Sequence, residues 1–527
     1  MAKDVAIRHL IDGGWATDYG THAEVEVSRD GGVRLPFLLR AENIFYNLRG
    51  GVRKCGGTSK YNATTIESGE EIRGMFEFVK VGTAGSATRK RVVHAGTKIL
   101  KDDNDGTFTS IFTGLEDNKI PNYCVFEDVL IISSDSTVDV PKTWDQSSAA
   151  NLGGSPPNFS FAVSHVNRVW AAGDAAVPSR LYYSSLLNAA QWNGTGDSGS
   201  IDVSPDDGDI ITGIYPYRGR LIVFKGPNFG SIHVVSGQTV ATFARDILVP
   251  GVGAVWQNLL FPFGNDLGFV SPDGLVRSLR TTEKFGDLEQ ATLSLPIQSW
   301  LLENVTVSSL KKGWAATDHS MGYVVFTLPT QSSTTPNHTI AMDYRFQEPR
   351  WADWDDFDAY SVVRMSDPST DRPILYLGGS DGFLRKLQQP TRAIDENTAI
   401  GAFVRTPFLH YGTQHRMKTL QHVGLGTQIQ NESTVTVALR KDIGTTEIDF
   451  DLTAGGFVLG DADENEFVLD TSTLADDSYK TVWADATESG QFREISYEIY
   501  NQELNEDMNI DSLHAVFEES ANPSYEN

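Results

Sequence analysis

The stretch from Phe161 to Gly237 has the sequence FAVSHVNRVWAAGDAAVPSRLYYSSLLNAAQWNGTGDSGSIDVSPDDGDIITGIYPYRGRLIVFKGPNFGSIHVVSG. Apolar segments of about five residues alternate in it with turns rich in Gly, Pro, Asn and Asp, which is typical of short strands in an all-β protein. The predicted strands are His165–Ala172, Arg180–Ser185, Ile210–Ile214, Arg220–Lys225 and Ser231–Val235. The stretch therefore predicts two consecutive antiparallel sheets.

Strands that begin after a polar turn and end near a glycine recur along the chain. They are Asn167–Trp170, Gly219–Phe224, Asn265–Val270 and Met321–Phe326. Their spacing of roughly 45 to 55 residues is typical of the four-stranded blades of a β-propeller. A propeller is therefore the predicted fold of this part of the chain.

A second pattern also indicates repetition. The segment Asp273–Leu279 is echoed by Asp381–Leu387, and in each segment an Asp-Gly turn precedes an alternating strand. The two segments share few residues, so a stack of β-sandwiches remains open as an alternative. Helix is scarce, and Pro296 interrupts the helical periodicity of Glu289–Leu302, which predicts one or two short turns there.

The character of the sequence changes on both sides of this repeat. A glycine-rich segment, Arg49–Gly57, comes before it. After Gln388–Pro390 the strands become longer, and Phe492–Tyr500 alternates as a half-buried strand does. We predict an all-β chain with an N-terminal arm and platform segment over 1–60, a β-propeller over 61–390, and a β-sandwich-like platform domain with a flexible tail over 391–527.

The composition sets limits on function. The 527 residues include 69 acidic and 43 basic side chains, giving a net charge of −26, which argues against a protein that binds nucleic acid through bulk positive charge. No apolar run reaches the roughly 18 residues needed to span a bilayer, and Met1–Val5 does not lead into a signal-peptide core, so a soluble chain is expected. Cys55 and Cys124 are expected to be free thiols, because two cysteines are too few for a disulfide scaffold.

Two serine motifs match nucleophile sites of hydrolases. Gly196–Gly199 matches the sequence around the nucleophile of chymotrypsin-like proteases, but it lies in a polar loop and the nearest upstream histidine, His165, lies in a predicted strand. Gly378–Gly382 has the Gly-x-Ser-x-Gly pattern, but a strand follows where a nucleophile elbow needs a helix. The sequence also lacks a His-Glu-x-x-His motif and a Walker loop. We interpret both serine motifs as turns and predict no catalytic residue.

Acidic and aromatic clusters are the remaining candidate sites. Asp102–Gly106 and Asp461–Glu466 could cage calcium, although neither extends into a full EF-hand loop. His410 and His415 are the only closely spaced histidines, and a metal site there is not favoured. Trp351–Asp356 places aromatic rings beside acids, as glycan-binding and glycan-hydrolysing proteins do. We favour solvated turns for the acidic loops and packing for the tryptophans, and assign no cofactor and no metal ligand.

The order of these parts resembles the tail nozzle, or tail hub, proteins of short-tailed bacteriophages, also called packaged-DNA stabilization proteins. The strongest similarity lies in Val166–Gly173, Arg180–Ser185, Ala190–Trp192, Ile201–Val203, Asp206–Ile214 and Leu221–Lys225. Weaker similarity is found in the N-terminal Arg40–Gly57 and in the C-terminal Lys418, Asp442 and Tyr497–Phe517. The resemblance covers most of the chain, and its motifs are structural.

The resemblance implies a virion structural protein without enzymatic activity or cofactor. It implies a propeller mounted on sandwich-like domains, in a homo-hexameric ring that extends the channel of the portal and its adaptor. The implied function of this ring is to help retain packaged DNA and to conduct it during ejection. The implied partners are the head-to-tail adaptor ring beneath the portal, tail fibres and the tail tip or needle protein, and genomic DNA that passes without sequence-specific binding. The implied location is the virion tail, after synthesis in the host cytoplasm.

The acidic composition fits this role independently, because carboxylates make phosphate contacts unfavourable and would let the duplex slide. A glycan-binding or glycan-hydrolysing propeller, based on Trp351 and Trp354 beside Asp353 and Asp355, remains the alternative from another class. A host-encoded propeller scaffold is a third hypothesis.

Overall fold

The computed structural model describes residues 4–519 apart from 12, 22–31, 49, 83–84, 86, 286–290, 358, 412–415, 429–432, 443 and 453–478. Contacts divide the chain into two compact units. The two-sheet unit comprises residues 1–58, 349–356 and 388–527, and the propeller unit comprises residues 59–348 and 357–387. Within the described residues, no helix is long and apolar enough to cross a bilayer.

Consecutive strands of the propeller unit form antiparallel meanders. The first two sheets contain β9 (Ile72–Val81), β10 (Ala87–Ala95), β11 (Lys98–Asp102) and β12 (Phe108–Phe112), then β13 (Pro121–Phe126), β14 (Val129–Ser134), β15 (Lys142–Trp144) and β16 (Ala149–Asn151). The next two contain β17 (Phe161–His165), β18 (Arg168–Ala172), β19 (Arg180–Tyr183) and β20 (Gly199–Asp202), then β21 (Ile210–Tyr217), β22 (Arg220–Gly226), β23 (Ser231–Ser236) and β24 (Ala244–Pro250). The prediction of two consecutive antiparallel sheets over Phe161–Gly237 is confirmed.

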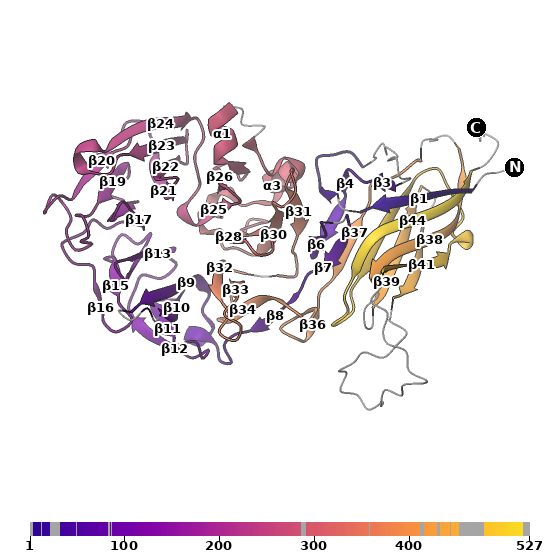
Figure 1. The fold of residues 1–527 in the computed structure, drawn as a ribbon, viewed down its shortest axis with the longest axis horizontal. Coiled ribbons are helices and arrows are strands. Elements are labelled where there is room, and N and C mark those ends of the chain that lie inside the picture. The colour runs from indigo at the N-terminus through magenta and orange to yellow at the C-terminus, as the bar shows by residue number, and fades with distance from the viewer. Residues whose placement is uncertain are drawn as a thin grey trace. The chain divides into compact units, whose positions relative to one another are not determined.

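Further sheets complete the ring. They contain β25 (Leu260–Phe263), β26 (Asp266–Val270) and β27 (Val276–Ser278); β28 (Trp314–Asp318), β29 (Tyr323–Leu328) and β30 (His338–Asp343); and β32 (Ser361–Ser366), β33 (Pro373–Gly378) and β34 (Leu384–Gln389). The first strands of most successive sheets are neighbours, β21 contacts η3, which leads into β25, and β32 returns to β9. The sheets therefore surround a common axis (Figure 1). The fold is a β-propeller, as predicted, and the alternative of stacked sandwiches is wrong.

The repeated strands found in the sequence occupy equivalent places. They are β18, β22, β26 and β29, each the second strand of its blade. Every residue of β18 and β29 is buried, because a strand inside a blade is covered by neighbouring blades on both faces. The Asp-Gly turns also correspond, since both join the second strand of a blade to the third and place Gly274 and Gly382 at positive φ.

The propeller is closed by a strand from the beginning of the chain. β8 (Gly57–Lys60) comes before every other blade strand in the sequence, yet it lies beside β34, the last one. Next to it, the Tyr61 backbone N–H donates to the Leu384 carbonyl over 2.7 Å. The last blade therefore combines residues more than 300 positions apart in the sequence.

Helical segments lie between strands of the propeller unit. They are η1 (Ile66–Gly69), η2 (Val240–Thr242), η3 (Gln257–Leu259), α1 (Leu279–Phe285), η4 (Leu295–Ile297), α3 (Gln298–Asn304) and η5 (Val307–Lys312). The α-helix predicted near Pro296 is short and begins two residues after this proline, which cannot donate a backbone hydrogen bond. The helix α1 was not predicted.

The two-sheet unit joins both ends of the chain. One sheet has the order β3 (Gly32–Arg34), β1 (Asp4–Leu10), β44 (Asn509–Glu519), β38 (Lys418–Gln428), β41 (Tyr479–Asp485), with β6 (Ile44–Tyr46), β7 (Val52–Lys54) and β42 (Gln491–Phe492) attached. The other contains β31 (Arg350–Asp353), β5 (Arg40–Glu42), β37 (Ala402–Arg405), β43 (Ile495–Asn501), β39 (Thr434–Lys441) and β40 (Gly444–Asp451). Short pairs are β2 (Gly14–Trp15) with β4 (Phe37–Leu38), and β35 (Ala393–Ile394) with β36 (Thr398–Ala399); η6 (Thr487–Ser489) follows β41.

The two sheets of this unit contact each other through aromatic side chains. The His9 ring of β1 lies 6.2 Å from the Tyr497 ring of β43, and the Tyr411 hydroxyl lies within hydrogen-bonding distance of both side chains. β1 pairs with β44 along six residues. The N-terminal segment is therefore part of the same unit as the C-terminal strands.

Residues 349–356 differ from the predicted boundaries, which placed them in the propeller. They belong to the two-sheet unit, where β31 runs parallel to β5. The Tyr46 hydroxyl donates to the Trp351 carbonyl over 2.6 Å, and the Phe45 and Trp354 rings meet edge to face at 5.3 Å. These contacts bury both tryptophans.

Candidate functional site

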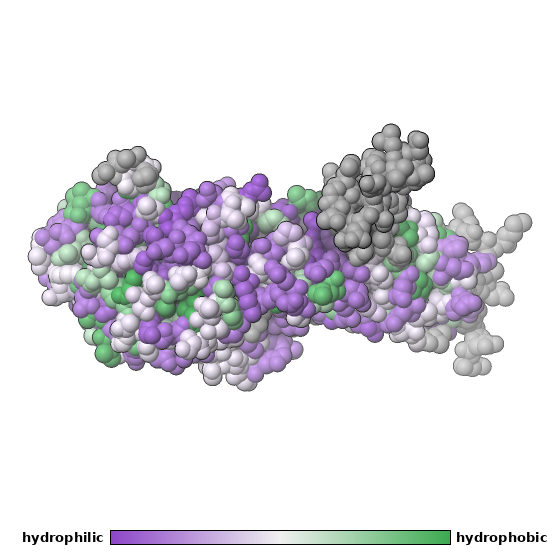
Figure 2. All heavy atoms as spheres, turned by 90° about the horizontal axis from the view of Figure 1, so that it is seen from below, coloured by the Kyte–Doolittle hydropathy of each residue, from purple (hydrophilic) through white to green (hydrophobic). Residues whose placement is uncertain are grey.

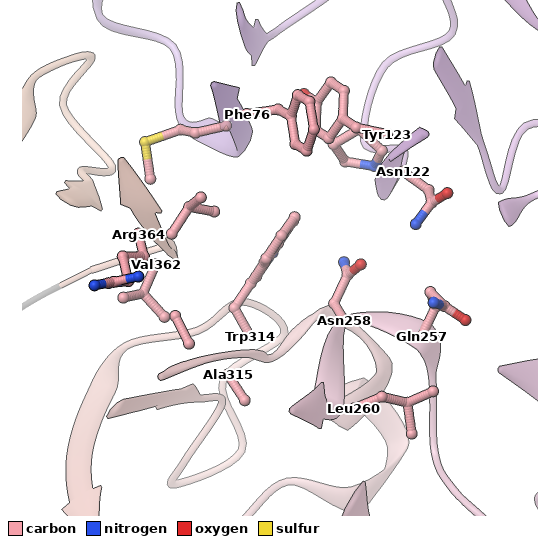
Figure 3. A pocket seen from close by; sticks show the side chains of 14 residues that line it. Phe76, Asn122, Tyr123, Gln257, Asn258, Leu260, Trp314, Ala315, Val362 and Arg364 are labelled. Carbon is pink, nitrogen blue, oxygen red and sulfur yellow. The ribbon is translucent and has the colours of Figure 1, made fainter. Parts of the chain in front are cut away.

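A cavity of about 230 Å³ lies where the innermost elements of the propeller unit converge (Figure 3). Its lining comes from β9, β13, η3, β25, β28 and β32, which are separated by up to about 290 residues in the sequence. The lining residues are Met75, Phe76, Pro121, Asn122, Tyr123, Gln257, Asn258, Leu260, Trp314, Ala315, Ala316, Val362, Val363 and Arg364. We call this the axial cavity.

Aromatic side chains form one part of the wall. The Phe76 and Tyr123 rings are stacked with centroids 5.4 Å apart, and the indole of Trp314 projects from the opposite side (Figure 3). Gly74 of β9 makes room for this indole, because a Cβ at that position would lie 3.1 Å from Trp314 and 2.4 Å from Pro121. A substitution of Gly74 would therefore displace the wall.

Polar groups without hydrogen-bond partners among the described residues form another part of the wall of the axial cavity. Asn258 is 8% exposed and its amide points into the cavity (Figure 3). Its Nδ2, the Tyr123 hydroxyl and the Arg364 Nε are buried and have no hydrogen-bond partner among the described residues. Burial raises the pKa of Tyr123, so this hydroxyl stays protonated and can donate. Each unmet group costs about 1–3 kcal/mol unless water or a ligand satisfies it.

Neighbouring amides are already engaged. Both ends of the Gln257 carboxamide bond the backbone of Ile214, over 2.8 and 3.0 Å, and the Asn122 Oδ1 accepts the Ala162 N–H over 3.0 Å. These bonds connect η3 to β21 and β13 to β17, and so hold adjacent blades together. The axial cavity can therefore hold water or a small polar molecule. It is smaller than the roughly 300–1,000 Å³ of pockets for drug-sized ligands.

The sequence did not single out any residue of the axial cavity. Tyr123 and Trp314 are ordinary aromatic residues of short strands, and Asn258 lies in a turn. No local motif marks them, because the cavity exists only when distant strands meet.

The loop of the protease-like motif is held by Arg168. Its guanidinium donates to the Ser184 carbonyl over 2.8 Å and pairs with the Asp197 carboxylate, which it holds at a pKa below the usual range. The Ser198 hydroxyl donates to the Thr195 carbonyl over 2.8 Å. Each polar side chain of the motif is thus engaged within its own loop or by β18, as expected for a turn.

The second serine motif is also a turn. It joins β33 to β34, and the Asp381 carboxylate accepts the Phe383 N–H over 3.2 Å and two hydrogen bonds from Arg385 at 2.9 and 2.6 Å. A strand follows the turn, so the strand-to-helix geometry of a nucleophile elbow is missing at this place.

The acidic loop at Asp102 is filled by protein donors. One carboxylate oxygen accepts the N–H groups of Asp105 and Gly106 at 3.0 Å, and the other accepts the Tyr61 hydroxyl at 2.6 Å and lies 3.3 Å from Arg91. The second acidic loop, Asp461–Glu466, and His415 lie outside the described residues. Among the residues that the structure describes, no group of three His, Cys, Asp or Glu side chains could hold a metal ion.

Trp351 and Trp354 are at most 1% exposed, so neither offers a ring face to a sugar. The Trp354 indole N–H donates to the Ile44 carbonyl over 3.3 Å. The tryptophans therefore pack, as the favoured interpretation held, but within the two-sheet unit.

Cys55 and Cys124 are free, buried thiols, as predicted.

Residues quoted for the family resemblance connect two blades. The Lys225 ammonium group of β22 donates to the Val203 and Ser204 carbonyls at 2.7 Å and to the Asp207 carboxylate at 2.6 Å. Asp209 accepts three backbone N–H groups of residues 228–230, which turn β22 into β23. These acidic and basic side chains are structural.

No family model matches the chain, and no curated protein matches it. Solved structures similar to it include YCF48 bound to D1 peptide, with 8% identity, a TM-score of 0.40, and coverage of 66% of this chain and 97% of that one. The computationally designed Ika8 protein has 11% identity, a TM-score of 0.35, and coverage of 63% and 99%. The Cps50 (Swd1) β-propeller domain of Myceliophteria thermophila has 11% identity, a TM-score of 0.37, and coverage of 62% and 99%. These scores are too low to support an argument about function.

Proposed function

We propose that the chain is a tail nozzle subunit of a short-tailed bacteriophage, which forms a hexameric ring that extends the portal channel and conducts DNA. The observation that supports this proposal is the arrangement of the parts along the chain. The segments on both sides of the propeller fold together as one two-sheet unit, so the propeller is an insertion in that unit. The family resemblance implies the same arrangement, a propeller mounted on sandwich-like domains.

The connections between the units suit a part that transmits force. The chain passes between the two-sheet unit and the propeller unit at four places, next to residues 58, 349, 356 and 388. A tethered binding module needs one covalent connection, and this chain has four. This feature favours a mechanical role over that of a tethered binding module.

The surface charge suits a conduit for DNA. The excess of carboxylates gives the chain a net charge of −26, and hydrophilic residues dominate the face seen in Figure 2, with hydrophobic ones in small separate patches. Negative walls repel phosphates, so a duplex can pass without being held. The axial cavity of about 230 Å³ is far too small for a duplex. In this proposal the DNA therefore passes through the opening of the ring of subunits.

The outer strands of the blades are candidates for contacts between subunits. β24 is the outermost strand of its blade, and Ile247 at its centre is 58% exposed. An edge strand with an exposed apolar side chain can pair with or pack on a neighbouring chain. In a cyclic ring each subunit would use two different surfaces.

Electron microscopy of the full chain tests the proposal. The chain is imaged alone and mixed with portal and adaptor rings of the same virus, and the symmetry of class averages is measured. A sixfold ring with a central opening, formed alone or on the adaptor, is the expected result. Single disc-shaped particles that do not associate with either ring would contradict the proposal.

The glycan alternative is not favoured by any observation at its original residues, since Trp351 and Trp354 are buried.

A further inference from the structure

A second cavity, of about 320 Å³, lies on the first sheet of the two-sheet unit. Its lining includes Arg8 of β1, Lys480 and Thr481 of β41, and Asp511, Ser512 and His514 of β44. The sheet residues on the other face, such as Leu513 and Ala515, are buried. We call this cavity, together with the neighbouring Trp483, the sheet-face site.

Strand register places these side chains in two rows across the sheet. One row runs Arg8, His514, Gly424, Trp483, and the other runs Ser512, Gly426, Thr481. Arg8 and Trp483 are three strand spacings apart, about 14 Å at roughly 4.8 Å per spacing. The Arg8 guanidinium and the Trp483 indole thus lie at the two ends of this row, and both side chains are long enough to extend towards its middle.

Two glycines of the middle strand β38 form the floor. A Cβ at Gly424 would lie 2.8 Å from the Trp483 ring, and a Cβ at Gly426 would lie 2.3 Å from the Ser512 hydroxyl oxygen. The indole therefore lies directly over the backbone of β38, with its ring 5.6 Å from that of His514. Any larger residue at these positions would displace the indole and fill the site.

Trp483 is 50% exposed, which is unusual for so large an apolar side chain. The indole packs on the backbone of β38 and beside His514, and half of its surface stays open. An open indole offers a flat apolar face on which a ligand can stack.

The charges of the site are mixed. Arg8 forms no ion pair with a carboxylate of the described residues, so its guanidinium can receive an anionic group in two parallel hydrogen bonds. Lys480 adds a second positive charge. Burial and, next, Arg8 lower the pKa of His514, so the imidazole is neutral at neutral pH and shares a 3.0 Å hydrogen bond with Ser512.

A β-bulge adds a carboxylate to this set. The pairing of β38 with β44 shifts between Gly426, which pairs with Ser512, and Thr427, which pairs with Ile510, so that Asp511 is the extra residue of the bulge. Bulges redirect side chains and are common beside functional sites. Asp511 lines the cavity, where a carboxylate accepts hydroxyl hydrogens and repels a phosphate dianion.

We infer that the sheet-face site binds an acidic sugar residue of the uronic or sialic acid type. The carboxylate of the sugar lies against Arg8 and Lys480, its hydroxyl groups bond Asp511 and Thr481, and its C–H face stacks on Trp483. This set of groups fits a ligand with one acid group and several hydroxyls better than a nucleotide, whose phosphate would meet Asp511. The inference does not depend on formation of a ring.

Isothermal titration of the full chain tests this assignment. The probes are oligosaccharides of glucuronate, galacturonate, mannuronate and sialic acid, each compared with its methyl ester, which keeps the sugar and removes the charge. At least one acid should bind at least tenfold more tightly than its ester. The variants Trp483→Ala and Arg8→Ala should each weaken that binding at least tenfold. Both side chains are exposed, so the unfolding temperature should stay unchanged.

Controls separate binding from general effects. Phe229→Ala and Arg180→Ala remove an exposed aromatic ring and a partly exposed arginine from the propeller unit and should leave the affinity unchanged. Trp483→Phe, which keeps an aromatic face, should retain part of the affinity. Absence of binding to every acid, equal binding of acid and ester, or unchanged binding by Trp483→Ala would overturn the assignment. Tighter binding of oligothymidylate at the same residues would overturn it in favour of a nucleotide.

Discussion

Lys225 has no exposed surface, and its ammonium group is satisfied by the loop that leads from the preceding blade. Replacing it by methionine keeps the length of the side chain but leaves two carbonyls and the Asp207 carboxylate without their donor. We expect Lys225→Met to lower the free energy of unfolding by about 2–4 kcal/mol, measured by urea denaturation.

The matched control for this variant is Lys101→Met. Lys101 is 26% exposed and pairs with the exposed Asp103. Its removal should cost less than about 1 kcal/mol. An equal decrease in the free energy of unfolding for the two variants would show that the buried hydrogen bonds of Lys225 stabilise the fold no more than an ion pair at the surface does.

His94 makes stability depend on pH. Burial and, next, Arg73 lower the pKa of His94 to about 4, and neither ring nitrogen has a hydrogen-bond partner among the described residues. The unfolded chain takes up a proton at this position near pH 6.5, and the folded chain does so only near pH 4. Its contribution is therefore complete above pH 6.5 and is lost as the pH falls towards 4, by about 2–3 kcal/mol.

The variant His94→Leu should have a shallower decrease of unfolding free energy between pH 6.5 and 4 than the unmodified protein, because leucine binds no proton. Denaturation curves across this range measure the slope. His319→Leu, which removes an exposed histidine, should keep the original slope. The same slope in both variants would exclude His94 as a contributor.

At the scale of elements, Asn62 fastens the closing strand of the propeller. It is 1% exposed, accepts the Leu384 N–H over 2.7 Å, and donates to the carbonyls of Gly382 and Thr64 at 3.0 and 2.7 Å. Asn62→Ala should lower the free energy of unfolding by about 2–4 kcal/mol, since buried backbone groups lose their partners. Asn151→Ala, which removes an exposed carboxamide bonded to Lys142, should cost less than about 1 kcal/mol.

Some strands and turns could be predicted from local sequence patterns alone. β18 and β29 were found in the sequence because they are apolar on both faces, and the Asp-Gly turns because their chemistry is local. No local pattern placed β31 with the two-sheet unit, because that grouping depends on the packing around Trp351 and Trp354.

At the scale of the whole molecule, the charge makes a prediction about DNA. If carboxylates keep the duplex from adhering, the assembled protein should retain no duplex even at about 10 mM salt, where the screening length is about 30 Å and charge effects are strongest. Filter retention of labelled duplex measures this. Tight retention that disappears on raising the salt concentration would contradict a sliding surface.

The sequence by itself determined the strand repeat, the second strand of several blades, the acidic surface and the free thiols. Each of these depends on residues close together in the chain or on composition alone. Only the tertiary structure decided that β1 pairs with β44, that polar groups without partners meet in the axial cavity, and that Trp483 lies over Gly424. The physical reason is that alternation of apolar residues fixes which face of a strand is buried, whereas the partner of each strand depends on register and topology across hundreds of residues.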